Sequence, residues 1–259
     1  MILIGERINS TREDIKRALT ERDGGFILEE ARRQDICDYL DVNASLLMEG
    51  EGDALRWLVE TIQGSLDKPL SIDTPSPKAL LEAIRVHRGR AIVNSISAQR
   101  ERLEGFIPII EEFKPKVIAL LMDDEGIPEP EGRVSIAEKI ISELTKRGIE
   151  PQDIFLDPII KPISVEPLSG IKALRTIRLL RERFPDFQIV IGLSNISYGL
   201  PRRRNINRAF IVPSIFEGVS ALILDPDRDT LSFIYASLAL SGKDEGGIKY
   251  IRAIREGKI

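Results

Sequence analysis

Residues 154–158 read Ile-Phe-Leu-Asp-Pro, a short apolar run that ends in a carboxylate and a proline. Runs of this kind recur along the whole chain, and they cover residues 2–4, 39–40, 70–72, 91–93, 117–122, 154–156, 189–193 and 221–224. Short, continuously apolar runs are typical of strands that are buried on both faces, as in a parallel sheet. The sequence therefore predicts eight buried strands.

Longer amphipathic stretches separate these runs. Residues 55–66, 103–113, 134–144 and 168–180 carry apolar side chains at helical spacing, so we expect each helix to turn one apolar stripe toward the sheet. Residues 246–259 are typical of a terminal helix. Eight β–α units in about 250 residues indicate a (β/α)₈ TIM barrel, with a doubly wound open sheet as the main alternative. Because no stretch is typical of a linker, we predict one α/β domain over residues 1–259.

The composition excludes several kinds of site. The chain has 259 residues and a formal charge of −4, from 37 basic and 41 acidic residues. This balance disfavours binding to nucleic acids or membrane surfaces, since proteins that bind them usually carry an excess or a patch of basic residues. One cysteine and one histidine exclude a disulfide framework, a thiolate zinc site and any site built on several histidines. With neither a signal peptide nor a long apolar segment in the sequence, we expect a soluble protein of the cytoplasm.

Acids, amides and serines follow the predicted strands. In a barrel, the carboxyl ends of the strands build the active site. Asp and Asn also favour turns and helix caps, and on that ground we assign Asp123, Asp124 and Asp225 to loops or turns. The residues at the strand ends are Glu6, Asp41, Asn43, Asp73, Asn94, Ser95, Asp123, Asp124, Asp157, Ser194, Asn195 and Asp225.

The chemistry of this set leaves two interpretations open. The last two strands lack a glycine-rich phosphate loop, and no lysine ends a strand, since Lys161 is better read as a solvated loop residue. Paired aspartates can hold a divalent cation. They can also accept hydrogen bonds from a heterocycle such as an aminopyrimidinone, which offers an amine and a ring N–H side by side.

The strand ends also carry a set of ordered motifs. They are Ile4-Gly5-Glu6-Arg7-Ile8-Asn9, Asp41-Val42-Asn43, Ser71-Ile72-Asp73, Asn94-Ser95, Leu156-Asp157-Pro158 and Gly192-Leu193-Ser194-Asn195-Ile196-Ser197. In these motifs the chain resembles the pterin-binding methyltransferases from Ile4 to about Asp225, and most resembles the methyltetrahydrofolate:corrinoid/iron–sulfur protein methyltransferases. The folate-binding domain of methionine synthase and dihydropteroate synthase are related TIM barrels.

The resemblance implies roles for particular residues. Asn195 would lie near N5 of the pterin and act in catalysis, with Asp157 helping to set the hydrogen-bonding state of the ring. Arg203 would lie near the folate tail. Tyr198 departs from relatives that carry glutamine there. The other residues implied to bind the substrate are Glu6 and Asp41 in the mouth, Asp73, Asn94 and Asp157 on the ring, Gly192 and Ser194 on one wall, and Ile223 as an apolar contact.

The implied activity is transfer of the N5-methyl group between methyltetrahydrofolate, or a related reduced pterin, and the cobalt of a corrinoid protein. The resemblance further implies a corrinoid carried by a partner, a homodimer, no metal bound by the chain itself, and neither a nucleic-acid nor a membrane partner. Three alternatives remain: a non-catalytic folate-binding subunit, a dihydropteroate synthase, and a barrel enzyme with a cation at Asp73 and Asp157. The synthase is disfavoured because its strand-one loop, its basic strand-seven element and its late Arg-His pair are missing. Here the only histidine, His87, is expected on the surface of an outer helix, and Cys37 is expected in helix packing.

Overall fold

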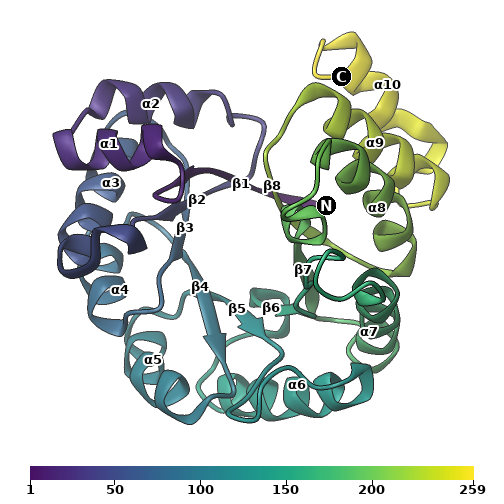
Figure 1. Ribbon diagram of the computed structural model, residues 1–259, viewed down its shortest axis with the longest axis horizontal. Helices are drawn as coiled ribbons and strands as arrows, with labels where there is room; N and C mark the ends of the chain where they lie inside the picture. Colours follow the sequence, from purple (N-terminus) through teal and green to yellow (C-terminus); the bar gives the residue numbers. More distant parts are fainter.

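A computed structural model describes all 259 residues and contains a closed barrel of eight parallel strands. Each strand pairs with the next in the chain, and β8 returns to pair with β1, so the prediction of a TIM barrel is confirmed and the open sheet is excluded (Figure 1). The strands are β1 (Ile2–Asn9), β2 (Tyr39–Asn43), β3 (Leu70–Asp73), β4 (Ile92–Ser97), β5 (Lys116–Leu120), β6 (Ile154–Asp157), β7 (Gln188–Gly192) and β8 (Ala221–Leu224).

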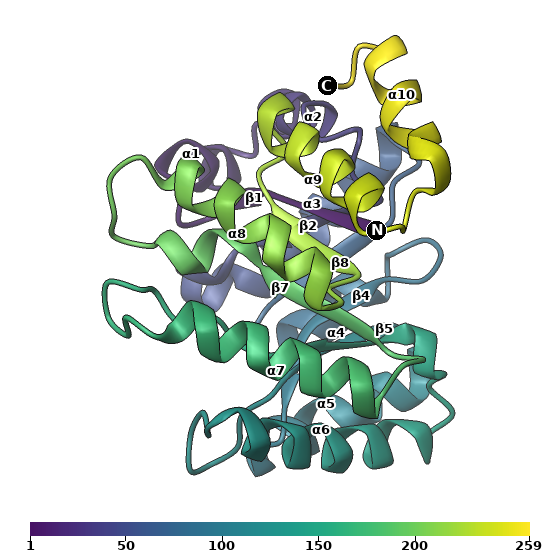
Figure 2. The ribbon, with the colours of Figure 1, turned by 90° about the vertical axis from the view of Figure 1, so that its right-hand side faces the viewer.

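Helices surround the barrel, and the predicted ones are all present (Figure 1). The terminal segment forms a shorter helix than expected, α10, which packs against α9 (Figure 2). None of the helices combines the length and the apolar character that crossing a lipid bilayer requires. The α-helices are α1 (Glu13–Glu21), α2 (Gly24–Arg32), α3 (Glu51–Ser65), α4 (Pro77–Ile84), α5 (Arg100–Phe113), α6 (Pro130–Thr145), α7 (Ser169–Arg183), α8 (Arg203–Glu217), α9 (Arg228–Leu240) and α10 (Ile248–Arg255).

The apolar stripe predicted for residues 168–180 faces the barrel over only part of its length. Leu168 precedes α7 and is 57% exposed, and Ile171 is 67% exposed, whereas Ile177 and Leu180 are buried. A strict three-residue spacing advances by about 300° per step, so the row drifts around the helix by about 60° each time. Both ends of such a row cannot face the same sheet, and this part of the prediction was wrong.

The barrel interior is filled by one compact apolar layer. Along each strand, side chains alternate between the interior and the surrounding helices, so the residue two positions after an interior residue also points inward. Glu6 follows Ile4 in this way, and Asp157 follows Phe155. Polar side chains thus stand directly above the apolar layer, which consists of Ile4, Ile92, Ile118, Phe155, Val190, Ala221 and Ile223.

The first strand runs further than its apolar run predicts. Its pairing with β2 shifts register between Gly5 and Ile8, and the buried side chain of Gln34 supplies an acceptor there, because its Oε1 takes the hydrogen bond of the Arg7 N–H at 2.9 Å. A β-carbon on Gly5 would collide with the Gln34 amide. The glycine therefore lets β1 continue through the irregularity and carry Glu6 into the interior.

His87 and Cys37 lie near the amino-terminal ends of β3 and β2, away from the open end of the barrel. His87 follows α4 instead of lying on it, is half-buried, and accepts a hydrogen bond at Nε2 from the backbone N–H of Leu70 at 3.0 Å. Burial lowers the pKa of His87. Cys37 is buried between α2 and β2, outside any helix, where burial raises the pKa of its thiol to about 12. Neither side chain reaches the open end of the barrel.

Candidate active site at the open end of the barrel

A cavity of about 690 Å³ opens at the carboxyl ends of the strands. A smaller one, of about 340 Å³, lies near Met1, Gly218 and Lys243 and shares no residue with the first. The larger cavity is lined by every residue that the sequence assigned to the site; these are Glu6, Asp41, Asp73, Asn94, Asp157, Gly192, Ser194, Asn195, Arg203 and Ile223. Their roles toward a ligand stay predictions.

Two carboxylate–amide pairs cross the barrel rim. Asn94 of β4 donates through Nδ2 to Asp41 of β2 at 3.0 Å, and Asn43 of β2 donates through Nδ2 to Asp73 of β3 at 2.9 Å. The Asn43 side-chain oxygen in turn accepts from the Ser10 hydroxyl at 2.8 Å. Asn43 is thus a strand-end residue that does not line the cavity but orients one that does.

Burial controls the ionisation of the acids in this ring. It raises the pKa of Asp73 to about 6, against the hydrogen bond from Asn43. It raises the pKa of Asp41 well above its usual range, and the neighbouring Asp73 charge adds to that effect. Desolvation also raises the pKa of Glu6. Several acids with raised pKa values in one cavity are typical of a functional site.

Asp157 keeps one oxygen free for a ligand. Its Oδ1 accepts the backbone N–H of Ile159 at 2.7 Å, while Oδ2 makes no hydrogen bond within the protein. Burial raises the pKa of Asp157 to about 6. Asp73 likewise has one oxygen without a donor, and the side-chain oxygen Oδ1 of Asn94 accepts no hydrogen bond within the protein. The three side chains therefore offer acceptor positions to a donor-rich heterocycle.

The segment after β7 presents the other wall. The Ser194 hydroxyl donates to Glu6 Oε2 at 3.3 Å. Asn195 is exposed to the cavity, and its side-chain amide makes no hydrogen bond within the protein, so it does not cap a helix. Its Nδ2 lies close above Gly192, where a β-carbon would approach it to 2.8 Å. Asn195 is thus a free donor beside a glycine that leaves room for it.

Arg203 lines the cavity but is largely occupied by its own loop. Its Nη2 donates to the carbonyl of Ser194 at 2.6 Å, its Nε donates to the Ser197 hydroxyl at 3.2 Å, and the guanidinium lies 5.6 Å from the centre of the Tyr198 ring. It therefore holds the segment that carries Asn195, with Nη1 left free for a ligand.

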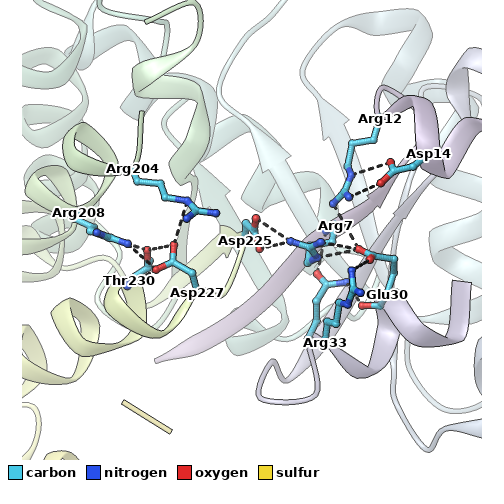
Figure 3. Close-up of polar contacts among 11 residues, drawn as sticks. Arg7, Arg12, Asp14, Glu30, Arg33, Arg204, Arg208, Asp225, Asp227 and Thr230 are labelled. Atoms are coloured by element: carbon cyan, nitrogen blue, oxygen red, sulfur yellow. Dashed lines mark hydrogen bonds and ion pairs between the residues drawn. The ribbon is translucent and has the colours of Figure 1, made fainter. Parts of the chain in front are cut away.

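An ion-pair network extends the site across β1 and β8. Arg7 joins two acids, with Nη2 2.8 Å from Glu30 and Nη1 3.0 Å from Asp225. Figure 3 shows Asp225 at the centre, between the arginines around Glu30 and the group formed by Arg204, Arg208 and Asp227. We expected Asp225 only in a turn, but Arg7 draws its carboxylate to the cavity wall. One arginine from each group, Arg12 and Arg204, lines the cavity.

The fifth strand contributes no polar side chain to the cavity. Asp123 and Asp124 lie in a turn beyond it, as expected, and Leu120 lines the cavity instead. Sequence reasoning also missed a group near β1, α8 and α9, because the true ends of those elements were needed to place it. This group consists of Asn9, Thr11, Arg12, Arg204, Asn207, Asp227 and Thr230.

No three His, Cys, Asp or Glu side chains converge closely enough to hold a metal ion. Asp73 and Asp157 therefore lack a third ligand of these types in the structure. The set of acceptors is better matched to a neutral donor-rich ring, since carboxylates and amides pair well with adjacent N–H groups.

The chain is similar in sequence to a described protein family and to individual known proteins. The family described as pterin binding enzyme matches residues 6–225. The methylcorrinoid:tetrahydrofolate methyltransferase of Eubacterium limosum is 34% identical over 265 residues, which cover 100% of this chain and 98% of that protein. The methionine synthase of Mycobacterium tuberculosis is 27% identical over 88% of this chain, which spans 20% of that longer protein.

Among solved structures, the Yersinia pestis dihydropteroate synthase with a pterine-sulfa conjugate has a TM-score of 0.67 and 17% identity. The match covers 93% of each chain. At this identity the likeness shows the fold alone.

Proposed function

This chain belongs to the pterin-binding enzyme family, and on that premise we propose that it is a methyltransferase that moves the N5-methyl group between methyltetrahydrofolate, or a related reduced pterin, and the cobalt of a corrinoid protein. The observation that carries the proposal is the similarity over the full chain to a methylcorrinoid:tetrahydrofolate methyltransferase. The cavity supports it, because its acceptors match the donor edge of a pterin.

Ring binding falls to Asp73, Asn94 and Asp157. A pterin presents its exocyclic amine next to a ring N–H, and a carboxylate can accept from both. An asparagine can accept from one ring position and donate to another. Glu6, Asp41, Gly192, Ser194 and Ile223 complete the walls in this proposal, and the free nitrogen of Arg203 faces the folate tail.

Asn195 acts on N5, where the methyl group leaves or arrives. Negative charge develops on N5 as the N5–methyl bond breaks and the methyl passes to cobalt, and a hydrogen bond from the Asn195 amide stabilises that charge. N5 then takes a proton from water to give tetrahydrofolate, and the reverse transfer returns this proton. A donor of this kind contributes roughly 10²–10³ to the rate when it acts in the transition state. The transition state is common to both directions, so the same residue serves either one. Asp157 sets the hydrogen-bonding state of the ring.

The corrinoid supplies the nucleophilic or methylated cobalt, and a separate partner protein carries it. The chain itself contributes no nucleophile in this scheme, which accords with the absence of histidine and cysteine from the cavity. We place the protein in the cytoplasm as a homodimer that needs no metal ion of its own and binds neither nucleic acid nor membrane.

A methyl-transfer assay with free cobalamin tests the proposal. In the presence of the protein, cob(I)alamin and methyltetrahydrofolate are expected to give methylcobalamin, which is detected by its absorbance. Methylcobalamin and tetrahydrofolate are expected to give methyltetrahydrofolate in the reverse direction. Binding of methyltetrahydrofolate without transfer in either direction, also with a corrinoid protein present, would favour a non-catalytic subunit. Formation of dihydropteroate from a dihydropterin diphosphate and p-aminobenzoate would favour the synthase.

A further inference from the structure

We propose that Arg133, on α6 outside the barrel, is a positioning residue that aims the Asp157 carboxylate by holding the backbone turn that follows it. The use of methyltetrahydrofolate in one test rests on the proposed function, whereas the positioning role of Arg133 is tested in the ligand-free protein.

Arg133 is buried and donates its hydrogen bonds to backbone carbonyls. The residue is only 4% exposed. Nε donates to the carbonyl of Pro128 at 2.9 Å, and Nη1 donates to the carbonyls of Pro158 at 2.6 Å and Ile159 at 3.2 Å. A buried guanidinium without an ion-pair partner is costly, so an arginine at this place needs a reason beyond helix packing.

The turn that Arg133 holds has an unfavourable backbone conformation. Ile159 has a φ of 58°, in the left-handed region. For a β-branched residue this conformation is rare and unfavourable, because its β-carbon crowds the following carbonyl oxygen. It persists only where the surroundings fix it, and the two carbonyls that Arg133 contacts lie on either side of the Ile159 α-carbon.

The peptide held by Arg133 is what directs Asp157. The Pro158 carbonyl and the Ile159 N–H belong to one planar peptide and point in opposite directions, so the carbonyl held by Arg133 keeps the N–H on Asp157 Oδ1 at 2.7 Å and leaves Oδ2 without a donor. If the turn relaxed, Oδ1 would lose its donor and the carboxylate would be free to rotate. The chain of contacts therefore runs from Arg133 through the Ile159 peptide to the ligand-facing oxygen.

The charge of Arg133 acts on the same group. Burial raises the pKa of Asp157, whereas the Ile159 N–H and the Arg133 charge both lower it. The other charged groups around Arg133 are Glu166 and Glu129, which act on its own pKa. Both pair with Lys172, whose Nζ lies 2.7 Å from Glu166 and 2.6 Å from Glu129, and Glu166 also pairs with Lys161 at 3.3 Å, so the two acids face two cations. Loss of Arg133 should thus raise the pKa of Asp157 by removing both favourable interactions.

Carbon-13 NMR titration of the Asp157 carboxyl in the ligand-free protein tests this directly. For Arg133→Met we expect an upward shift of the midpoint by about half a unit or more, since a hydrogen bond and a nearby charge are both lost. Ile159→Gly relieves the backbone strain, so the double variant Arg133→Met/Ile159→Gly should recover the contribution of the hydrogen bond but not that of the charge. Arg133→Lys keeps the charge with fewer fixed donors and should shift the midpoint less.

Arg181 provides a matched control. It also donates to three backbone carbonyls, those of Pro185, Phe187 and Gly218, but at the far side of the barrel. Arg181→Met should lower the melting temperature and leave the Asp157 midpoint unchanged. If Arg133→Met fails to fold, Arg133→Lys carries the test.

A second readout uses methyltetrahydrofolate. Arg133→Met should raise its dissociation constant about tenfold or more, and Ile159→Gly in that background should recover part of the loss. An unchanged Asp157 midpoint in folded Arg133→Met or Arg133→Lys would overturn the inference. If the wild type does not bind methyltetrahydrofolate, the proposed function fails, whereas the NMR result still decides the role of Arg133.

Discussion

The side-chain amide of Asn195 occupies the space that a side chain on Gly192 would fill. A β-carbon built on Gly192 would lie 2.8 Å from Asn195 Nδ2, which is closer than real contacts allow. Gly192 has φ of −75° and ψ of 95°, so its backbone does not itself require glycine. The glycine is needed for the position of the amide three residues later.

Gly192→Ala should therefore displace Asn195 without unfolding the protein. We expect methyl transfer to slow by roughly tenfold or more, as for loss of a transition-state donor. The double variant Gly192→Ala/Asn195→Ala should be no slower than Asn195→Ala alone, since both changes remove the same interaction. Gly64→Ala is the control, because nothing lies within 4 Å of a β-carbon there. Additive losses in the double variant would contradict this account.

Asn195→Ala should separate binding from transfer. The amide makes no contact that stabilises the fold, so we expect normal stability and nearly unchanged affinity for methyltetrahydrofolate. The single-turnover rate of transfer should fall at least about tenfold. Asn205→Ala, on the exposed side of the first turn of α8, serves as the control. An unchanged rate would remove Asn195 from the mechanism.

Pterin affinity should depend on pH in one direction. Asp73 and Asp157 each have a pKa of about 6 in the free protein, raised mainly by burial. Ring N–H donors need ionised acceptors, so the dissociation constant should rise as the pH falls through about 6, by about tenfold per unit for each carboxylate that must be ionised. Calorimetric titration between about pH 5 and 8 measures this. A flat profile would show that neither carboxylate must be ionised.

Asp157→Asn should stabilise the ligand-free protein at neutral pH. Because the folded pKa of Asp157 is raised to about 6, the free energy of unfolding of the wild type falls as pH rises from the unfolded value near 4 to the folded value. A neutral amide escapes this loss, so the variant should gain about 3 kcal/mol at pH near 8 and little at pH near 4.

Thermal unfolding at both pH values checks the gain. Asp186→Asn is the control, since Asp186 is exposed and forms no ion pair. A gain of equal size at both pH values would point to packing instead of ionisation. Ligand affinity of Asp157→Asn should fall although the protein is more stable.

The barrel and much of its site were predictable because the apolar runs mark the strands and side chains point into the barrel at every second residue. Glu6, Asp157 and Asn94 each follow, by two positions, an interior residue that belongs to an apolar run. Leu120 follows the same rule, while Asp123 lies beyond the end of β5. Counting from the interior residue Ile118, instead of from the end of the run, would also have placed Leu120 in the cavity.

Other features depend on contacts between distant segments. The extension of β1 rests on Gln34, and the placement of Asp225 rests on Arg7, which lies more than 200 positions away. His87 was expected on the surface because the sequence does not show its hydrogen-bond partner, the backbone N–H of Leu70 at the start of β3. No local pattern encodes such pairs. Arg133 is a similar case, since only the folded loop reveals that an outer helix reaches the site.

The carboxylate–amide pairs at the rim have a consequence for the divergence of related sequences. Asn94 serves Asp41, and Asn43 serves Asp73, with each hydrogen bond joining different strands. Replacing one residue of a pair would leave a buried polar atom of the other without a hydrogen bond, which would lower the free energy of unfolding by about 1–3 kcal/mol. Accepted substitutions at positions 41 and 94 should therefore occur together, and so should those at 43 and 73. An alignment of related barrels should show stronger covariation within each pair than between the two.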